Sequence, residues 1–514
     1  MARRPRGCKY TVIEGENQEK GQEVGFNVLK ETKVNASFIK IRCKNEPLAH
    51  FVSLPHRPTN VAEKKREIKS KDRASRSQTP PAKPFNVFII GLDSTSRLNA
   101  IRHLSKTRRY LLDSLNATEF VMFNKVGLNT RPNLAALFTG DTERLTRDDK
   151  GPTLWDNFHS KGFWTFYGDD WDTTAWAMGF NDAKLDRRFR KVLKFYETLP
   201  KQSDGSHGCI HGRRFGNMVQ DYFADFLDAH RSYPEDSIFA FVWSCSWTHD
   251  YVNWAKMADQ PTRRLMERIN EMGDLDNAVL IFISDHGVRL DSFAKTFQGN
   301  MENNAPILFT VFPKWFHSQF SDLVRNIRVN SQRLVSVYDV RKTLLHLLHL
   351  QTNASEWEND FDGDGKSLSL LTPVPERSCT DARVPIAFCN CHRFEEVDVK
   401  ETKVKMAADA FVQTVNEAMA VMKGKCAKLT LKEVDQSRKV RDEETYVLQM
   451  KMEPKGLFQA WVDMKSNVTI VDLKFASRLD RYGNAPYCVV DRDELKDFCQ
   501  CLPINAVIAV GKKS

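Results

Sequence analysis

The fold of this chain is decided by the stretch Phe85-Asn86-Val87-Phe88-Ile89-Ile90-Gly91-Leu92-Asp93-Ser94, which is apolar almost throughout before it ends in an aspartate. A short, continuously apolar run of this kind indicates a strand that is buried on both faces. We therefore expect a buried strand over Phe85–Leu92, with Asp93 at its carboxyl end.

The same pattern continues along the chain. Further strands are expected at 120–123, 163–167, 238–243, 278–284 and 307–312. Helical patterns separate them, at about 97–115, 132–138, 154–160, 212–230, 262–272 and 338–350. Alternating helices and apolar strands predict an α/β fold, with a mostly parallel sheet flanked by helices. In such sheets, ligands bind beyond the carboxyl ends of the strands.

The pattern changes on either side of this core. Residues 1–60 are expected to form a short N-terminal β-rich module, because residues 38–43 alternate as a strand should. Residues 61–84 are basic and then Pro-rich, which predicts a linker. The core is expected to span residues 85–378. Residues 379–514 are expected to form a smaller, Cys-rich α+β domain.

A basic run at 64–76 carries much of the net charge of +10. Such a run can be a nuclear signal or a nucleic-acid patch. A solvated linker is the better interpretation, because the Pro-rich residues 77–84 follow directly. We therefore expect no nucleic-acid partner.

The composition of the 514 residues, 41% hydrophobic and 28% charged, is typical of a soluble globular protein. No apolar run reaches the roughly 18 residues that indicate a transmembrane helix, so no membrane span is expected. The first residues are basic, but no apolar run follows them, so no signal peptide is visible.

The 11 cysteines favour a disulfide framework over reduced thiols. Cys-x-Cys pairs occur, but not the Cys-x-x-Cys knuckles of a zinc ribbon. We expect about five bridges, with Cys8–Cys43 as the most local N-terminal candidate and Cys245 as the candidate for a cysteine outside the disulfides. Glycosylation sequons point the same way, to an extracellular protein or to the lumen of the secretory pathway. The sequons start at Asn35, Asn116, Asn353 and Asn467.

Residues with metal-binding chemistry follow the apolar strands. Asp93 ends the first, Asp285-His286 follows the strand at 279–283, and His249 lies shortly after the strand at 238–243. A carboxylate at one strand end and an Asp-His pair at another supply oxygen and imidazole donors for a divalent cation. Taken alone, Asp93 also fits a turn or a helix cap.

A candidate nucleophile lies in Asn129-Thr130-Arg131-Pro132-Asn133. Pro132 suits the first turn of a helix, which places Thr130 at a helix N-terminus, where backbone N–H groups favour an anion. A hydroxyl beside a metal can be held as an alkoxide and attack at neutral pH. The alternative is that Thr130 only caps the helix.

Together these elements resemble the alkaline phosphatase/sulfatase superfamily, in which a strand-end Asp, a nucleophile before a short helix and a late Asp-His share one cation. Within it, the chain is similar to an uncharacterised animal family, domain of unknown function two hundred and twenty-nine, from about residue 8 to 501. Further motifs carry this resemblance: Ile90-Gly91-Leu92-Asp93-Ser94-Thr95-Ser96-Arg97-Leu98-Asn99, Thr165-Phe166-Tyr167-Gly168-Asp169-Asp170-Trp171, Thr248-His249-Asp250-Tyr251-Val252-Asn253 and Arg377-Ser378-Cys379-Thr380-Asp381-Ala382.

The resemblance implies one divalent metal, expected to be Zn, with Ca, Mg or Mn as alternatives. Its ligands would be Asp93, Thr130, Asp285 and His286. A second metal is less clearly implied, because the superfamily's second zinc uses Asp-x-x-x-His and here Cys245 stands four residues before His249. His249 is then a candidate for a second metal or a non-bridging oxygen, and Arg131 and Asn133 are candidates for phosphoryl contacts.

Thr130 argues against a formylglycine sulfatase, because threonine cannot form that aldehyde. The Thr-x-Pro-Asn form instead resembles the nucleotide pyrophosphatase/phosphodiesterase and phosphoethanolamine transferase branches. We therefore expect a metal-dependent hydrolase or transferase that acts, through Thr130, on small-molecule or on glycan- or lipid-linked phosphoesters. Two alternatives stay open: a sulfatase-like hydrolase of sulfate esters, and a non-catalytic extracellular binding or structural protein on a decayed enzyme scaffold.

Overall fold

The computed structural model falls into two compact units. One comprises Met1–Val288 and Glu302–Val384, and the other Arg289–Met301 and Pro385–Ser514. The structure describes the chain except for residues 1–6, 15–17, 28–29, 35, 37, 45–49, 55–56, 75–79, 81, 144–150, 171–183, 190–208, 211–212, 354–364, 466–468, 481–484, 490–494 and 503–514.

The larger unit is built on a 7-stranded sheet, in which β13, β5, β12, β8 and β9 run parallel. β14 pairs antiparallel with β13, and β6 antiparallel with β14. This confirms the predicted α/β fold with a mostly parallel sheet. In spatial order the strands are β6 (Thr118–Glu119), β14 (Leu308–Val311), β13 (Ala278–Ile283), β5 (Asn86–Leu92), β12 (Ile238–Ser244), β8 (Trp164–Asp169) and β9 (Arg187–Arg188).

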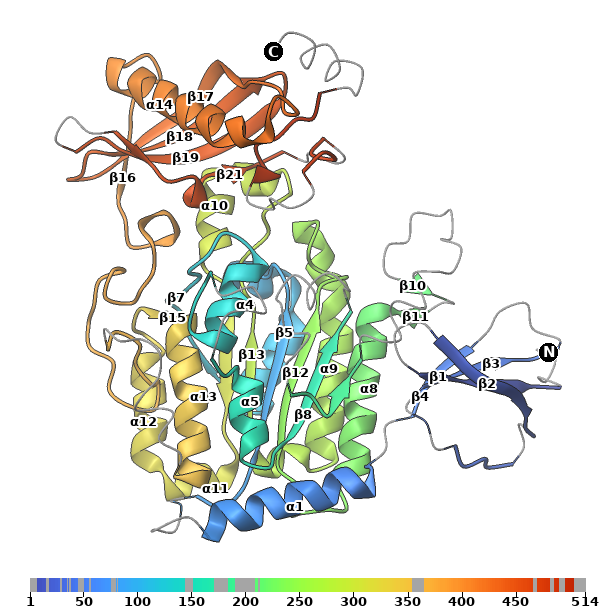
Figure 1. The fold of residues 1–514 in the computed structure, drawn as a ribbon. Helices are drawn as coiled ribbons and strands as arrows, with labels where there is room; N and C mark the ends of the chain where they lie inside the picture. The colour runs from blue at the N-terminus through green and yellow to red at the C-terminus, as the bar shows by residue number, and fades with distance from the viewer. Residues whose placement is uncertain are drawn as a thin grey trace. The chain divides into compact units, whose positions relative to one another are not determined.

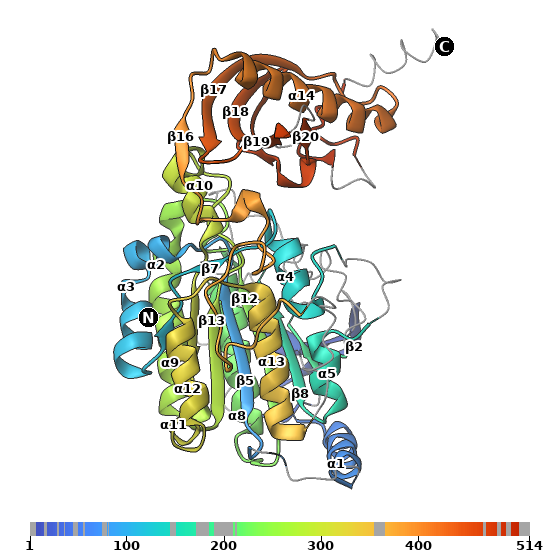
Figure 2. The ribbon, with the colours of Figure 1, turned by 90° about the vertical axis from the view of Figure 1, so that its left-hand side faces the viewer.

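Helices cover both faces of this sheet (Figures 1 and 2). On one face, the ring centroids of Phe138 and Phe241 lie 4.9 Å apart. On the other, those of Phe223 and Phe88 lie 5.4 Å apart. Because successive strand residues point to opposite faces, a strand covered on both sides must be apolar throughout. The covering helices include α4 (Thr130–Thr139), α5 (Leu154–Ser160) and α13 (Val337–Thr352) on the first face, and α8 (Phe215–His230) and α9 (Lys256–Glu271) on the second.

The ring of Trp243 packs directly over the backbone of Gly91 next to the site. A Cβ atom on Gly91 would lie 2.1 Å from ring atoms of Trp243 on β12. Only glycine therefore fits at this point of β5, two residues before Asp93.

The stretch predicted as a linker proves to begin with a helix, α1 (Thr59–Ala74). Lys65 is buried in it, forms an ion pair with Asp186 at 2.8 Å and donates a hydrogen bond to the carbonyl of Phe163 at 2.6 Å. The interpretation as a solvated linker is therefore wrong for residues 61–74, which are helical. A basic run is compatible with a packed helix. One face of α1 inserts Lys65 into the larger unit, and the other faces of the helix remain exposed.

The predicted N-terminal module is a 4-stranded antiparallel sheet with the strand order β2-β1-β3-β4. The predicted Cys8–Cys43 disulfide is present. Phe38 packs against Tyr222 of α8, with ring centroids 5.4 Å apart, so this sheet is part of the larger unit. Its strands are β1 (Lys9–Glu14), β2 (Gln18–Gly25), β3 (Phe38–Arg42) and β4 (His50–Ser53).

The smaller unit is an antiparallel sheet with one long helix, α14 (Thr402–Met419), which matches the predicted α+β class. Phe411 of the helix packs against Phe458 of the sheet, with ring centroids 6.0 Å apart. The strands lie in the order β16 (Phe394–Glu396), β17 (Thr430–Val440), β18 (Thr445–Glu453), β19 (Gly456–Asp463) and β20 (Ile470–Val471).

Disulfides close the smaller unit at Cys426–Cys499 and Cys488–Cys501. Cys379 and Cys389 are also disulfide-bonded. Cys245 is a buried thiol outside the disulfides, as predicted, and Cys391 is an exposed thiol. The side chain of Cys209 and the sequons at Asn35 and Asn467 lie outside the described residues. None of the helices in the described part of the chain has the length and apolar character needed to cross a membrane.

Candidate active site and metal centre

Adjacent parallel strands bring the two predicted acidic groups together. Ile283 of β13 is in register with Gly91 of β5, so the residues that follow the two strands emerge at the same edge of the sheet. Asp93, Asp285 and His286 are all buried there, and their ligand atoms lie within 4.8 Å of one another.

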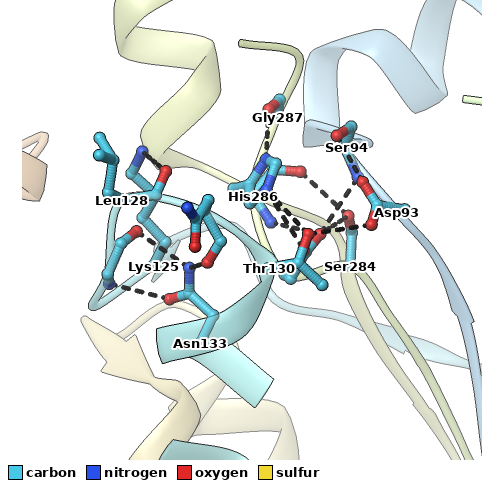
Figure 3. Close-up of polar contacts among 12 residues, drawn as sticks. Asp93, Ser94, Lys125, Leu128, Thr130, Asn133, Ser284, His286 and Gly287 are labelled. Atoms are coloured by element: carbon cyan, nitrogen blue, oxygen red, sulfur yellow. Dashed lines mark hydrogen bonds and ion pairs between the residues drawn. The ribbon is translucent and has the colours of Figure 1, made fainter. Parts of the chain in front are cut away.

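Thr130 reaches the same point from the first position of α4. Its hydroxyl donates a hydrogen bond to Oδ2 of Asp93 at 3.0 Å and lies 3.4 Å from Nε2 of His286 (Figure 3). Thr130 is half-buried, whereas the two groups it contacts are buried. The structure thus brings together the four residues that the sequence predicts as one metal site.

The ring of His286 is held in the orientation that suits a metal ligand. Nδ1 lies 2.7 Å from the carbonyl oxygen of Gly287, which only accepts, so Nδ1 carries the proton. Nε2 then presents its lone pair toward Oδ2 of Asp285 at 3.3 Å and toward the Thr130 hydroxyl. Metal-ligating histidines typically donate their other ring N–H to a protein oxygen in this way.

Asp285 has one oxygen that the protein satisfies and one that it does not. Its Oδ1 accepts hydrogen bonds from the backbone N–H groups of Ser94 and His286, at 3.1 and 2.8 Å. Its Oδ2 is buried and has no hydrogen-bond donor in good geometry among the described residues. Burial, followed by the charge of Asp93, raises the pKa of Asp285 to about 7. A bound divalent cation would satisfy this oxygen and neutralise both carboxylates, so the residues present fit a metal.

Asp93 is held in its charged form. Burial alone would raise its pKa, but the charges that His249 and His286 carry when protonated, with a hydrogen bond from Ser94, lower it below the usual value. Ser94 adopts φ 54°, in the left-handed region that side chains rarely occupy. Such local strain is found at functional sites, where the surrounding structure maintains it.

His249 lies near the site but outside the group of three ligand residues. It is close enough to lower the pKa of Asp93, and its Nδ1 lies 2.9 Å from Oδ1 of Asp250. About a third of its side chain is exposed. Arg131 is half-buried next to Thr130 in the first turn of α4. The predicted roles of His249 and Arg131 stay predictions.

The side chain of Asn133 binds the loop that precedes Thr130. Oδ1 accepts hydrogen bonds from the backbone N–H groups of Val126 and Gly127, at 2.8 and 3.0 Å. Nδ2 donates to the carbonyls of Gly127 and Asn129, at 2.9 and 2.8 Å. Because Asn133 is buried and its amide is saturated by the protein itself, this geometry does not support the predicted phosphoryl contact.

A second buried group lies beside the first, and its composition was not anticipated. Ligand atoms of Asp169, Asp170 and Cys245 lie within 4.8 Å of one another. Oδ1 of Asp170 accepts from the N–H of Cys245 at 2.6 Å, and its Oδ2 accepts from the Ser246 hydroxyl at 2.5 Å. Burial raises the pKa of Asp170 to about 6. Gly168-Asp169-Asp170 ends an apolar strand, which is the signal that would have pointed to it.

Comparisons with known proteins found solved structures of low sequence identity and no match among the curated proteins. The C-terminal periplasmic domain of EcEptC from Escherichia coli, in complex with Zn, is 11% identical and has a TM-score of 0.42, covering 59% of this chain and 90% of that chain. The lipoteichoic acid synthase LtaP from Listeria monocytogenes is 13% identical and has a TM-score of 0.42. The match covers 66% of this chain and 88% of the synthase chain. A protein in the alkaline phosphatase superfamily from Vibrio parahaemolyticus is 13% identical and has a TM-score of 0.42. The match covers 89% of this chain and 97% of that protein's chain.

The family comparison is decisive, because it matches residues 4–435, most of the chain, and agrees with the resemblance seen in the sequence motifs. The chain belongs to the family described as Protein of unknown function (DUF229).

Proposed function

We propose that this protein is a metal-dependent hydrolase or transferase of phosphoesters, with Thr130 as its nucleophile. The observation that carries the proposal is the position of the Thr130 hydroxyl, 3.0 Å from Oδ2 of Asp93 and 3.4 Å from Nε2 of His286. A half-buried hydroxyl at a helix N-terminus, among three buried metal-ligand side chains, matches the arrangement that activates a threonine.

The metal would be held by two carboxylates, an imidazole and the threonine oxygen. Asp93, Asp285 and His286 would be the protein ligands, and Thr130 would complete the set. This mixture of oxygen and nitrogen donors suits Zn²⁺, with Mn²⁺, Mg²⁺ and Ca²⁺ as alternatives to be tested. When bound, the cation would lower the pKa of the Thr130 hydroxyl and screen the charge of the phosphoryl group.

The chain's own residues would then act as follows. The Thr130 oxygen attacks phosphorus, and the bond to the leaving alcohol breaks on the opposite side, so that a phosphothreonine and a free alcohol form. Water or an acceptor alcohol next attacks the phosphothreonine, which restores Thr130 and gives either hydrolysis or transfer. The N–H groups of the first turn of α4 face the transferring anion. His249, whose Nδ1 lies 2.9 Å from Oδ1 of Asp250, would contact a non-bridging oxygen.

The proposed setting is the extracellular space or the lumen of the secretory pathway. The disulfides at Cys8–Cys43, Cys426–Cys499 and Cys488–Cys501 support this, since such bridges persist in oxidising compartments. The proposed substrates are phosphoesters of small molecules, or of glycans or lipids. Sulfate esters are the alternative class, to be separated by assay.

The test uses the disulfide-bonded protein loaded separately with Zn²⁺, Mn²⁺, Mg²⁺ or Ca²⁺. It is assayed with an aryl phosphomonoester, an aryl phosphodiester and an aryl sulfate. We expect turnover of a phosphoester that is lost in Thr130→Ala and partly retained in Thr130→Ser, which keeps a hydroxyl. Undiminished turnover by Thr130→Ala would refute the mechanism, and turnover of the sulfate ester alone would refute the substrate class.

A further inference from the structure

The loop that leads to Thr130 is fastened to the helix that Thr130 begins. This nucleophile loop, residues 125–129, connects β7 (Phe123–Asn124) to α4. Asn133 lies in the same helix, one turn after Thr130, and its side chain turns back to the loop (Figure 3). It makes four hydrogen bonds with loop backbone: it accepts from Val126 and Gly127 and donates to Gly127 and Asn129.

The contact between loop and helix is also sterically tight. A Cβ atom on Gly127 would lie 2.4 Å from Cγ of Pro132, so the loop backbone packs directly on the proline ring. Lys125 is buried at the start of the loop, and its Nζ lies 3.4 Å from the carbonyl oxygen of Leu128. The loop therefore has one closely defined path over the first turn of α4.

Asn133 binds the residue that immediately precedes the nucleophile. Asn129 immediately precedes Thr130, and its carbonyl is one of the two that Asn133 binds, at 2.8 Å. The amide of Asn133 uses both of its donors and both of its acceptor positions on the loop. Without Asn133, two buried N–H groups and two carbonyls would lose their partner, and the loop would have to rearrange.

We propose that Asn133 is a positioning residue: it fixes the nucleophile loop so that the Thr130 hydroxyl lies at Asp93 and His286. The inference rests on the proposed function of Thr130 as the nucleophile. It replaces the direct phosphoryl contact that the sequence suggested for Asn133. Misplacing a reacting group by about 1 Å lowers a rate by about 100-fold, so the effect should appear in kcat.

The chain offers a matched control in Asn330, a buried asparagine on α12 (Ser321–Asn330). Its Nδ2 donates to the carbonyls of Leu370 and Thr372, at 2.8 and 2.7 Å, and its Oδ1 accepts from the N–H of Val374 at 3.0 Å. Substituting Asn330 breaks the same kinds of buried bonds but leaves the nucleophile loop unchanged. Comparing the two sets of variants therefore separates a loss of overall stability from a displacement of the nucleophile loop.

The experiment compares Asn133→Ala and Asn133→Asp with Asn330→Ala and Asn330→Asp in the Zn²⁺-loaded full chain. The aspartates keep the acceptor but cannot donate to the two carbonyls. With para-nitrophenyl phosphate, or the corresponding diester if that is turned over, we expect kcat to fall about 10- to 100-fold in both Asn133 variants while KM changes less than about threefold. Both Asn330 variants should keep the wild-type kcat, even where they lower the melting temperature equally.

A second readout does not depend on activity. Hydrogen exchange of the backbone amides of Val126 and Gly127 should accelerate at least about tenfold in Asn133→Ala and stay at the wild-type rate in Asn330→Ala. Unchanged exchange of these amides would overturn the inference, as would a kcat equal to that of the Asn330 variants. A raised KM with unchanged kcat would also overturn it, in favour of a direct substrate contact. If Thr130→Ala keeps wild-type turnover, the proposed function itself fails, whatever the exchange shows.

Discussion

The thiol of Cys245 donates a hydrogen bond to Oδ2 of Asp93 at 3.1 Å, the same oxygen that accepts the hydroxyl of Thr130. Cys245 immediately follows β12, and Asp93 immediately follows β5, which is the parallel neighbour of β12. The two side chains therefore meet at one edge of the sheet. This hydrogen bond favours the charged form of Asp93 and helps to keep its pKa low.

Replacing this thiol should weaken metal binding. In Cys245→Ala, Asp93 loses one of its donors, so its carboxylate is less firmly oriented and less readily ionised. Removing a hydrogen bond to a metal-ligating side chain typically lowers metal affinity 10- to 100-fold, and we expect about 10-fold for Zn²⁺. Cys245→Ser keeps a donor at this position and should bind nearly as well as wild type. Competition with a chromophoric chelator measures all three affinities, and equal values for alanine and wild type would contradict the prediction.

Replacing Asp285 should have opposite effects on the stability of the metal-free and the metal-bound protein. Its pKa is raised to about 7 in the folded protein, so between about pH 4 and pH 7 the folded state holds a proton that the unfolded state has released. The stability of the metal-free protein should therefore fall as the pH rises through this range. Asp285→Asn removes the buried charge, and its metal-free form should melt above wild type at pH about 8.

The same variant should lose the stabilisation that a metal gives. A ligand at 100 times its Kd stabilises the folded state by about 2.7 kcal/mol, and Asp285→Asn lacks a charged ligand for it. Asp259→Asn is the control, because Asp259 accepts from the backbone N–H groups of Lys106 and Thr107 and lies outside the predicted ligands. It should melt lower than wild type yet keep the Zn²⁺ shift. An equal Zn²⁺ shift in both variants, measured by calorimetry, would show that Asp285 is not a ligand.

The predicted part of the fold follows from one physical regularity. Strands buried on both faces must be apolar throughout, so β5, β12 and β13 are visible as unbroken apolar runs. Parallel neighbours end at the same edge, which is why Asp93 and Asp285 could be expected to meet. The position of Thr130 could be anticipated because a proline two residues later indicates the first turn of a helix.

The parts that sequence reasoning could not supply depend on partners far along the chain or on directions of side chains. Residue type does not distinguish an asparagine that binds a substrate from one that binds its own loop, as Asn133 does. Lys65 looked like part of a solvated basic run, because its partners lie beyond residue 160 and nothing local predicts them. The pairing of Cys245 with Asp93 likewise needs the strand order, which a single sequence does not contain.

The docking of α1 can be tested through Lys65. Its ammonium group is buried and paired with Asp186 at 2.8 Å, with a further hydrogen bond to the Phe163 carbonyl at 2.6 Å. Removing one partner of a buried pair leaves the other charge uncompensated and costs about 3 to 5 kcal/mol. We expect Lys65→Ala to lower the free energy of unfolding by about this amount, as measured by urea denaturation.

The same helix supplies the control for this substitution. Lys71 pairs with Glu67 at 2.7 Å, but both side chains are mostly exposed. Exposed pairs contribute little, so Lys71→Ala should change the free energy of unfolding by less than about 1 kcal/mol. The double variant Lys65→Ala, Asp186→Ala should be less destabilised than the sum of the two single variants. If Lys65→Ala and Lys71→Ala proved equally mild, α1 would not be docked through Lys65.

His346 on α13 provides a pH-dependent contribution to stability away from the proposed active site. It is buried, its Nδ1 lies 2.9 Å from the Ser369 hydroxyl, and burial, followed by the charges of His349 and Lys342, lowers its pKa to about 4. As the pH falls below 6.5, the unfolded state takes up a proton that the folded state does not accept until about pH 4. The contribution of His346 to the free energy of unfolding is therefore present above pH 6.5 and is lost as the pH falls toward 4.

At pH about 5 the loss due to His346 should be on the order of 2 kcal/mol relative to pH about 7. His346→Gln keeps a polar group toward Ser369 but cannot gain this proton, so its free energy of unfolding should decline less over the same range. Other buried histidines such as His230, whose pKa burial also lowers, remain in both proteins and cancel in the comparison. Urea denaturation of the two proteins at several pH values measures the difference. Parallel pH profiles would mean that His346 has the same pKa in the folded and the unfolded protein, and would contradict the lowered pKa attributed to its burial.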